Sequence, residues 1–513
     1  MYVLSSSGMV VREAAPPRAA AIALAVTVIL VAAVSRLVYL IAPFDGDGAM
    51  FAYMGKLVAE GGRFGEDLLD NKFPTVGLVT SAFYRAFGSW WPGYVIGQLI
   101  LTFLAAAILA RQAARCFGEH ARWSTFIPAI VLLNINAAVM GGFQLETLQS
   151  FFAAVAAACS LAAIRSGDRR DALACGLASG CAMLIKPTGA AVLTALVLVC
   201  LITPWVVRNR RPRAIGGLIR AALVGAAFPL AVGVLYLEVS DQLRMLPVLA
   251  QQIAEYARCS SFAWEDALRP GILLFLFAAA MLIRGWVYRR DEHQAPSPAQ
   301  PEACWFAWGW LILELVGVLL QRRMYAYHFL PLACPAALVF ASLPRRVTVA
   351  QLAGPLALPV LFSIWGARDT VATARAETAD RFAVTRWLEA HTLPGERIWH
   401  DNTPFTLIHT DLRPASRVQL TFLFMNSDEA PARFSTVLLD DLRAHRPRFL
   451  ALQANLEHYL QRHTQGVMEL SRLPERRRNF VSAWRQIEDF AHNHYQPVAT
   501  VGRDTIWRRK DAS

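Results

Sequence analysis

Residues 189–207 read GAAVLTALVLVCLITPWVV and residues 20–34 read AAIALAVTVILVAAV, and neither stretch contains a charged side chain. An α-helix needs about 20 mostly apolar residues to cross a bilayer, and blocks of about this length recur along the chain. Of the 513 residues, 55% are hydrophobic and 17% are charged, against roughly 25% charged in an ordinary soluble domain. The sequence therefore excludes a plain soluble enzyme and indicates a polytopic α-helical membrane protein.

The basic charge of the chain is explained by membrane topology. A net charge of +12 would suggest nucleic-acid binding in a soluble protein, but here the arginines stand mostly at the ends of apolar blocks, where basic residues orient membrane helices. No nucleic-acid partner is expected. Seven of the eight cysteines lie in or beside apolar blocks and no C-x-x-C pair is present, so neither a disulfide framework nor a cysteine metal site is predicted.

The apolar blocks predict eleven transmembrane helices. Residues 19–42 are too long for the core of a signal peptide and are interpreted as a retained helix. Short arginine-rich connections fall on one side of the membrane, which the positive-inside rule assigns to the cytoplasm. We therefore expect a plasma (inner) membrane protein with a cytoplasmic N-terminus and a periplasmic or extracytoplasmic C-terminus. The other predicted spans are 93–110, 123–140, 147–164, 172–186, 188–206, 214–236, 271–287, 304–320, 329–343 and 348–366.

Two domains are predicted from this pattern: a transmembrane domain over residues 1–366 and a soluble α/β domain over residues 367–513. In the outward loop 43–92, apolar positions recur at helical spacing, which suggests helices lying on the membrane surface. In the tail, helix-like runs alternate with strand-like runs. PVATV (497–501) and TIWRR (505–509) flank a GRD turn and predict a closing β-hairpin.

The first candidate site residues lie in PFDGDGAMFAY, directly after the first span, where Asp45 and Asp47 stand two positions apart on a glycine-broken loop. One of these carboxylates could act as a general base. One alternative is that Asp47 only caps the helix that follows. Another is that the D-x-D pair holds a divalent cation through its oxygen atoms.

Lysine is rare in this chain: four of the 50 basic residues are lysines. A retained lysine suggests a need for a compact ammonium group in place of a planar guanidinium. Lys72, in DNKFP, and Lys186, in LIKPTG, are both expected at the outer face, where they could bind one phosphate. The alternatives are plain loop solvation for Lys72 and snorkelling to the interface for Lys186.

Further charged positions are expected on the outer side. Glu146 stands at a helix start, as a substrate-binding group or simply as a carboxylate favoured at a helix N-terminus. Arg36 lies near the outer end of the first span and either joins the basic cluster or snorkels. In QRRMYAYHFLP, two guanidiniums suit a phosphate or pyrophosphate, whereas the alternative is interfacial anchoring. The crowded side chains of that turn are Arg322, Arg323, Tyr325, Tyr327 and His328.

Other titratable residues are interpreted as structural. Glu314, inside a predicted span, is expected to be a helix-packing partner. The tail contains two pairs without the spacing of a zinc site, and these residues are expected at the surface: His400, Asp401, His492 and His494. No metal centre is predicted from them.

Four short motifs follow one another along the chain: Asp47 with Phe51-Ala52, Lys72-Phe73-Pro74, Lys186-Pro187 at the end of a Gly/Ala-rich helix, and Tyr327-His328-Phe329-Leu330-Pro331. In this order they resemble the C superfamily of glycosyltransferases that use polyprenyl-phosphate sugars, in particular the protein O-mannosyltransferases and lipid A aminoarabinose transferases. The first two motifs are similar to the family's Asp-Glu-x-x-Tyr-Ala and Lys-Pro-Pro. Gly48 stands where the family usually has Glu, and Phe73 replaces the first proline.

The resemblance implies an inverting glycosyltransferase that moves a hexosyl or pentosyl group from an undecaprenyl- or dolichyl-phosphate donor to a lipid, polysaccharide or protein acceptor outside the membrane. Breaking the sugar–phosphate bond adds negative charge to the phosphate, so cations at that oxygen stabilise the transition state. Lys72 and Lys186 are the expected cations, with Arg322 or Arg323 beside them. Asp47 would accept the proton of the acceptor hydroxyl. This scheme requires no nucleotide.

Two other classes of protein stay open. A lipid-linked glycan transporter, or flippase, would also need outward basic clusters, but it should show inverted repeats or paired intramembrane charges, and the sequence shows neither. A non-catalytic scaffold could present the arginine-rich tail to a partner. Loss of Asp47 would stop a transferase and leave a scaffold working.

Overall fold

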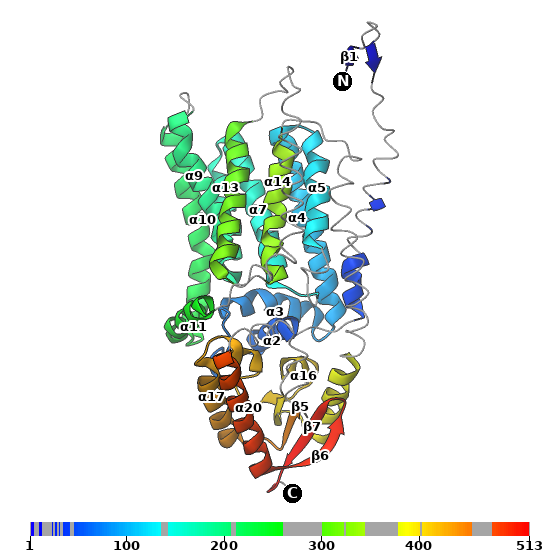
Figure 1. Ribbon diagram of the computed structural model, residues 1–513. Helices are drawn as coiled ribbons and strands as arrows, with labels where there is room; N and C mark the ends of the chain where they lie inside the picture. Colours follow the sequence, from blue (N-terminus) through cyan, green and yellow to red (C-terminus); the bar gives the residue numbers. More distant parts are fainter. Residues whose placement is uncertain are drawn as a thin grey trace.

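The computed structural model describes eleven continuous ranges and part of residues 23–33. The described elements form three levels (Figure 1). Long helices stand side by side, two shorter helices lie across one end of them, and an α/β segment follows beyond. Asp45, Arg323, Asp401 and the predicted spans 271–287 and 348–366 lie outside the described residues. The described ranges are 2–4, 10–12, 34–41, 46–134, 142–206, 212–259, 300–322, 325–343, 378–400 with 403–453, and 474–511.

Five described helices are long and apolar enough to cross a membrane. A shorter apolar stretch, Tyr327–Ser342, runs beside them. The prediction of eleven spans is not confirmed, because part of the predicted spans is not described and α8 is shorter than a full crossing requires. The helices of this level are α4 (Trp91–Phe117), α5 (His120–Leu133), α7 (Leu145–Ser166), α8 (Arg169–Ile185), η2 (Pro187–Ala190), α9 (Ala191–Val206), α10 (Pro212–Val239), α13 (Pro301–Gln321), η5 (Ala326–Leu332) and α14 (Ala333–Ser342).

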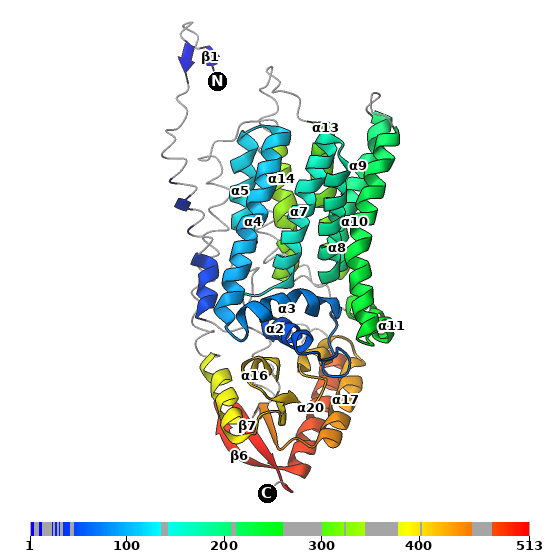
Figure 2. The ribbon, with the colours of Figure 1, turned by 180° about the vertical axis from the view of Figure 1, so that it is seen from behind.

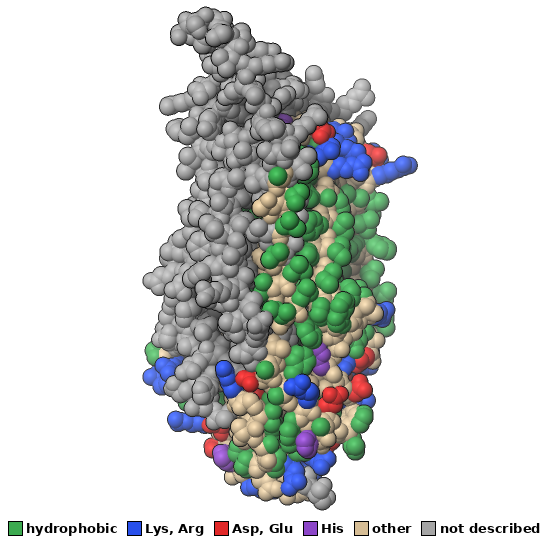
Figure 3. Space-filling model, turned by 90° about the vertical axis from the view of Figure 1, so that its right-hand side faces the viewer, with side chains coloured by type: hydrophobic (Ala, Val, Ile, Leu, Met, Phe, Trp, Pro, Cys, Tyr) green, Lys and Arg blue, Asp and Glu red, His purple; other side chains and the backbone are tan. Residues whose placement is uncertain are grey.

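The surface of the long helices is apolar, as a bilayer requires. Figure 3 shows hydrophobic side chains along their flank and charged side chains gathered at the two ends. On α10, Val224, Phe228 and Leu235 are 62–65% exposed. Soluble proteins rarely expose apolar surface of this extent, so the helices identify a multi-pass membrane protein.

The helices pack closely through small residues. A Cβ atom added to Gly176 of α8 would lie 1.9 Å from the carbonyl oxygen of Ala222 on α10, and one added to Gly225 of α10 would lie 2.2 Å from that of Leu173 on α8. Packing between small residues replaces the hydrophobic driving force that is absent between helices in lipid. Glycine is therefore required where α8 and α10 cross.

The arginine-bearing turns lie at one end of the long helices, and α2 and α3 lie at the other (Figure 2). Arg115 and Arg165 are in the last turns of α4 and α7, and Arg169 begins α8. The predicted division between an arginine end and an end that carries candidate site residues is thus present in the structure.

Helix α2 (Gly46–Ala59) differs from its predicted position on the membrane surface. Every residue from Gly48 to Leu57 is buried, because α3 (Thr75–Phe87) and the C-terminal segment cover it. A Cβ atom at Gly55 would lie 2.5 Å from the carbonyl oxygen of Thr80 on α3. The segment that buries α2 lies more than 300 residues away in the sequence, which local periodicity cannot reveal.

The C-terminal segment forms a five-stranded sheet in the order β4-β3-β5-β7-β6. Strands β4, β3 and β5 are parallel, and β7 pairs antiparallel with both β5 and β6, so the predicted closing hairpin is confirmed. Residues 378–391 are helical. The other elements of this segment are β3 (Arg397–His400), α16 (Thr403–His409), β4 (Arg413–Pro414), η6 (Thr421–Met425), α17 (Ala430–His445), β5 (Phe449–Gln453), α20 (Pro474–His494), β6 (Tyr495–Val501) and β7 (Asp504–Arg509).

Five short elements lie elsewhere in the described part of the chain: β1 (Tyr2–Leu4), β2 (Val10–Arg12), η1 (Val38–Leu40), η3 (Leu243–Met245) and α11 (Leu246–Arg258).

Both faces of the central strand β5 are buried, whereas the edge strand β6 is mostly exposed. Along β5, Phe449 and Ala451 belong to the hydrophobic core shared with α2, while Leu450 and Leu452 belong to the core formed with α17 and α20. This division follows the two-residue period of a strand. The prediction that His400 lies at the surface is wrong: it is 3% exposed on β3, and its Nε2 lies 3.4 Å from the Asp504 carboxylate.

Candidate functional site

Charged side chains gather where α2 and α3 meet the ends of the long helices. Asp47 is in the first turn of α2, and Lys72 lies in the loop before α3. Glu146 is in the first turn of α7, and Lys186 follows α8. These residues come from four separate elements, and the fold brings them to one end of the helix bundle.

Local chain chemistry sets the positions of Lys186 and Glu146. Lys186 precedes Pro187, and a residue before proline is disfavoured in the helical conformation; it is extended (φ −147°, ψ 140°) and ends α8. Glu146 lies where unpaired amide groups at the start of a helix favour negative charge. Both side chains therefore meet at the boundary between helix and turn.

Lys186 is held by a buried ion pair. Its Nζ donates to Glu146 Oε1, and also to Gln321 Oε1 at the end of α13, at 3.3 Å. The Glu146 side chain is 2% exposed and that of Lys186 is 14% exposed. The ammonium also lies 5.9 Å from the ring centroid of Tyr327. The alternative that Lys186 snorkels freely does not fit this geometry, since two of its three hydrogens are directed to protein acceptors.

Lys72 lies in a second cluster with two neighbours in sequence. Its Nζ donates to Asn71 Oδ1 at 2.6 Å and lies 3.7 Å from Asp70 Oδ1. The ring centroid of Phe51, on α2, is 6.0 Å away. Asp70 was not predicted as a site residue; its position two residues before Lys72 in LLDNKFP was the available signal.

The charged groups of this cluster shift one another's pKa values. Burial alone would lower the pKa of Lys72, but the carboxylates of Asp70, Asp47 and Glu146 raise it above its usual value. Burial raises the pKa of Asp70, the Lys72 ammonium lowers it in part, and Asp47 raises it again. Among the described residues, this cluster together with Lys186 has three carboxylates and two ammonium groups.

The predicted basic turn is mainly an aromatic cluster. Tyr327 stacks on Tyr325, with ring centroids 5.5 Å apart, and meets the ring of buried His328 edge-on at 4.6 Å. Arg322 directly follows Gln321 in a left-handed conformation (φ 55°), and its side chain is exposed. Arg323, its predicted companion, lies outside the described residues.

Arg36 neither joins the cluster nor snorkels, so both expectations for it are wrong. Its side chain is fully buried and donates to Gln98 Oε1 at 2.6 Å, Asn134 Oδ1 at 3.0 Å and Thr147 Oγ1 at 3.3 Å. All three acceptors are neutral. The hydrogen bond to Thr147 attaches the first span to the start of α7, next to Glu146.

Within the described ranges, no group of three or more His, Cys, Asp or Glu side chains could hold a metal ion. Asp45, the other half of the predicted D-x-D pair, lies outside those ranges. The described residues of the cluster offer carboxylates and ammonium groups at the end of a membrane helix bundle.

The chain is similar to known proteins in part of its sequence and in its fold. Residues 71–231 match the family model described as dolichyl-phosphate-mannose-protein mannosyltransferase, a range that includes Lys72, Glu146 and Lys186. No curated protein sequence matches the chain.

The fold is similar to two crystal structures of ArnT from Cupriavidus metallidurans. For ArnT bound to undecaprenyl phosphate, the TM-score is 0.60 at 16% identity, with 94% of this chain and 97% of that chain covered. For the apo state, the TM-score is 0.58 at 17% identity, with 95% and 98% covered. The chain thus shares the fold of ArnT, and its residues 71–231 are similar in sequence to the mannosyltransferase family model.

Proposed function

We propose that this protein is an inverting glycosyltransferase that moves a sugar from a polyprenyl-phosphate donor to an acceptor hydroxyl at the outer face of the membrane. The observation that carries the proposal is the position of Lys72 at the end of the apolar helices, where its ammonium lies 3.7 Å from Asp70 Oδ1 and the Asp70 and Asp47 carboxylates raise its pKa. A cation for the donor phosphate and a carboxylate for the acceptor proton thus lie together where a lipid headgroup would meet water.

Lys72 is suited to bind the donor phosphate. Its raised pKa keeps the ammonium charged at neutral pH. Asn71 and Asp70 orient it from one side. As the bond from the anomeric carbon to the phosphate oxygen breaks, the electron pair stays on that oxygen, and a fixed ammonium stabilises the growing charge.

Asp47 is suited to act as the base. It lies in the first turn of α2, close enough to Lys72 for its carboxylate to raise the pKa of that ammonium. The acceptor oxygen forms its bond to the anomeric carbon while the sugar–phosphate bond breaks, and the hydroxyl proton passes to the Asp47 carboxylate. A single displacement of this kind inverts the anomeric carbon and releases the polyprenyl phosphate.

Lys186 is proposed as the second cation, oriented by Glu146. One of its three ammonium hydrogens is not used by the Glu146 and Gln321 contacts. The neighbouring Tyr327 ring provides a surface for a lipid or sugar. We place His328 and Arg322 at the edge of the same donor site, without a defined contact; Arg323, which the sequence offers for the same role, lies outside the described residues.

The sidedness of the site is proposed from the positive-inside rule. The ends with Arg115, Arg165 and Arg169 would face the cytoplasm, and the candidate site and the C-terminal α/β segment would face outward in the plasma (inner) membrane. The ArnT structure that holds undecaprenyl phosphate supports a polyprenyl-phosphate donor here. The comparisons give no support to a flippase.

The proposal is tested in proteoliposomes with a panel of radiolabelled polyprenyl-phosphate hexoses and pentoses and total envelope lipids as acceptors. Asp47→Asn should lower the transfer rate by roughly 10²- to 10⁴-fold, and Lys72→Met by roughly 10²- to 10³-fold. Asp168→Asn is the matched control, because Asp168 caps α8 at the opposite end of the bundle. Wild-type transfer by Asp47→Asn would exclude it as the base.

A further inference from the structure

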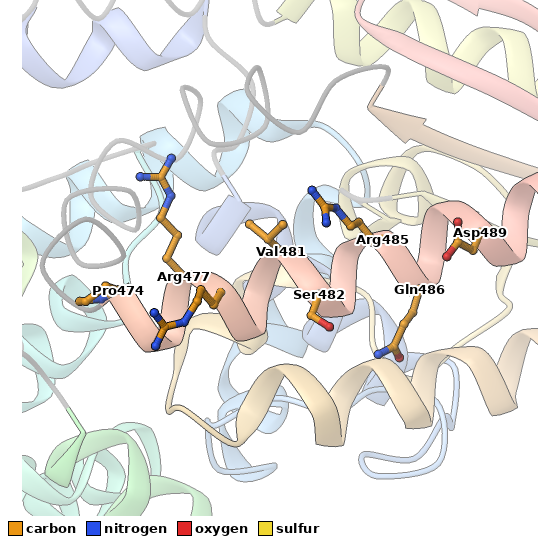
Figure 4. Close-up of a pocket in the computed structure, with 8 residues that line it drawn as sticks. Pro474, Arg477, Val481, Ser482, Arg485, Gln486 and Asp489 are labelled. Atoms are coloured by element: carbon orange, nitrogen blue, oxygen red, sulfur yellow. The ribbon is translucent and has the colours of Figure 1, made fainter.

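Helix α20 has one face that the catalytic proposal does not use. Arg477, Arg478 and Arg485 are exposed there and line a hollow of about 680 Å³ (Figure 4). We call these three residues the α20 arginine face. The hollow is also lined by Pro474, Val481, Ser482, Gln486 and Asp489.

The three arginines have no hydrogen bond or ion pair with any described residue, whereas their neighbour Arg476 is fully engaged. Arg476 is 2% exposed, pairs with Asp428 at 2.9 Å and donates to the carbonyl oxygen of Cys259 at 2.8 Å. Arg476 therefore has a structural role, whereas the side chains of the α20 arginine face are exposed. Like charges on one helix face repel one another, so a bound anion would stabilise this face.

The contacts of Arg476 also place the start of α20 near the membrane boundary. Cys259 ends α11, which follows the membrane-spanning α10 after a short turn. Glu255 of α11 adds a second attachment, because it accepts from Arg433 of α17 at 2.9 Å. Figure 1 shows α11 beside the end of α10 and α20 running away from that level.

The spacing along the helix gives the extent of this charged face. Arg477 and Arg478 are the fourth and fifth residues of α20. Arg485 lies about 10–12 Å farther along, at 1.5 Å per residue. The face therefore begins where a lipid headgroup would be and extends away from the apolar layer.

We propose that the α20 arginine face binds the phosphate groups of anionic membrane lipids. Guanidinium groups match phosphate oxygens through paired hydrogen bonds. Basic residues beside an anionic membrane surface each strengthen binding by a moderate and additive amount. Ser482 and Gln486, which also line the hollow, add neutral donors. This binding surface is separate from the Asp47 and Lys72 cluster and does not depend on the transferase proposal.

The test uses the full-length wild-type protein in nanodiscs of phosphatidylcholine alone or with phosphatidylglycerol. Phenylglyoxal modifies accessible arginines, and mass spectrometry reports the rate at each residue. We expect phosphatidylglycerol to slow modification of the α20 arginine face by roughly fivefold. High salt should remove the protection. The internal controls are Arg386 and Arg413, which are exposed on other parts of the C-terminal segment.

Three results would overturn the proposal. The first is equal modification in the two kinds of nanodisc. The second is equal protection of Arg386 and Arg413, which would show only a general surface charge effect. The third is protection by something other than anionic lipid. Full protection by free inorganic phosphate in phosphatidylcholine nanodiscs would indicate a soluble anion, and protection found only in native membranes would indicate a protein partner.

Discussion

Replacement of Lys186 by methionine tests the ion pair that joins α8 to α7. Methionine keeps most of the apolar length of lysine and removes the charge, so the carboxylate of Glu146, 2% exposed, would stay buried without its cation. Removal of one partner of a buried ion pair costs about 3–5 kcal/mol. Because the Lys186 side chain is 14% exposed and water can reach it, we expect the lower end, about 3 kcal/mol in the free energy of unfolding.

The double variant Lys186→Met/Glu146→Gln distinguishes the energy of the ion pair from the cost of leaving one buried charge without its partner. It removes both charges, so most of the lost stability should return, with a coupling energy of about 2 kcal/mol. Lys186→Arg keeps the charge but brings a wider planar group into a site shaped by Glu146 and Gln321, and should recover stability only in part. Dodecyl sulfate unfolding titrations followed by tryptophan fluorescence measure these differences.

Transfer rates then distinguish two roles for Lys186. If Lys186 binds the donor phosphate, the double variant regains stability and still transfers roughly 10²- to 10³-fold more slowly than wild type. If Lys186 only positions α7 and α8, activity returns together with stability. Unchanged stability of Lys186→Met would refute the argument from the buried pair, and full activity of that variant would end the phosphate-binding role.

Two further predictions concern the contact between α2 and the C-terminal segment. Burial, with the charge of Lys56 beside it, lowers the pKa of His409 from 6.5 to about 4, so its stabilising contribution is complete above pH 6.5 and is lost as the pH falls toward 4. We expect a loss of order 2 kcal/mol in acid unfolding curves, which His409→Phe should remove; identical curves would contradict this. Lys56 donates to the carbonyl oxygens of Leu407 and Thr410 at 2.7 Å each. Lys56→Met should remove the Lys56 donor from both oxygens and lower the free energy of unfolding by about 1–3 kcal/mol. It should also increase hydrogen exchange in residues 403–412. Unchanged exchange there would show that Lys56 does not hold the contact.

The predictions that succeeded depended on short stretches of sequence. The apolar blocks of α4, α7, α9, α10 and α13 could be recognised because hydropathy over about 20 residues decides whether a helix is stable in lipid. The hairpin of β6 and β7 followed from a turn signal between two strand-like runs.

The predictions that failed depended on what packs against a residue. The two expectations for Arg36 came from its position near the outer end of the first span. In the structure its side chain is fully buried and donates hydrogen bonds to three polar side chains of other segments. Helix α2 was placed on the membrane surface from its periodicity, but residues of a distant segment cover it. Asp70 was overlooked because an aspartate in a loop is ordinarily solvated, and burial became visible only in the folded chain.

The sequence by itself determined that this is a multi-pass membrane protein, which ends of its helices carry arginine, and the helix and strand content of its tail. These properties follow from transfer of local stretches between water and lipid and from local turn chemistry. Only the tertiary structure decided that Glu146 meets Lys186, 40 positions later, and that Asp70 and Asp47 act on Lys72. The physical reason is that the rotation and depth of each helix are set by close packing against its neighbours, as where Gly176 meets Ala222, and this fixes which polar groups lie within a few ångströms of one another.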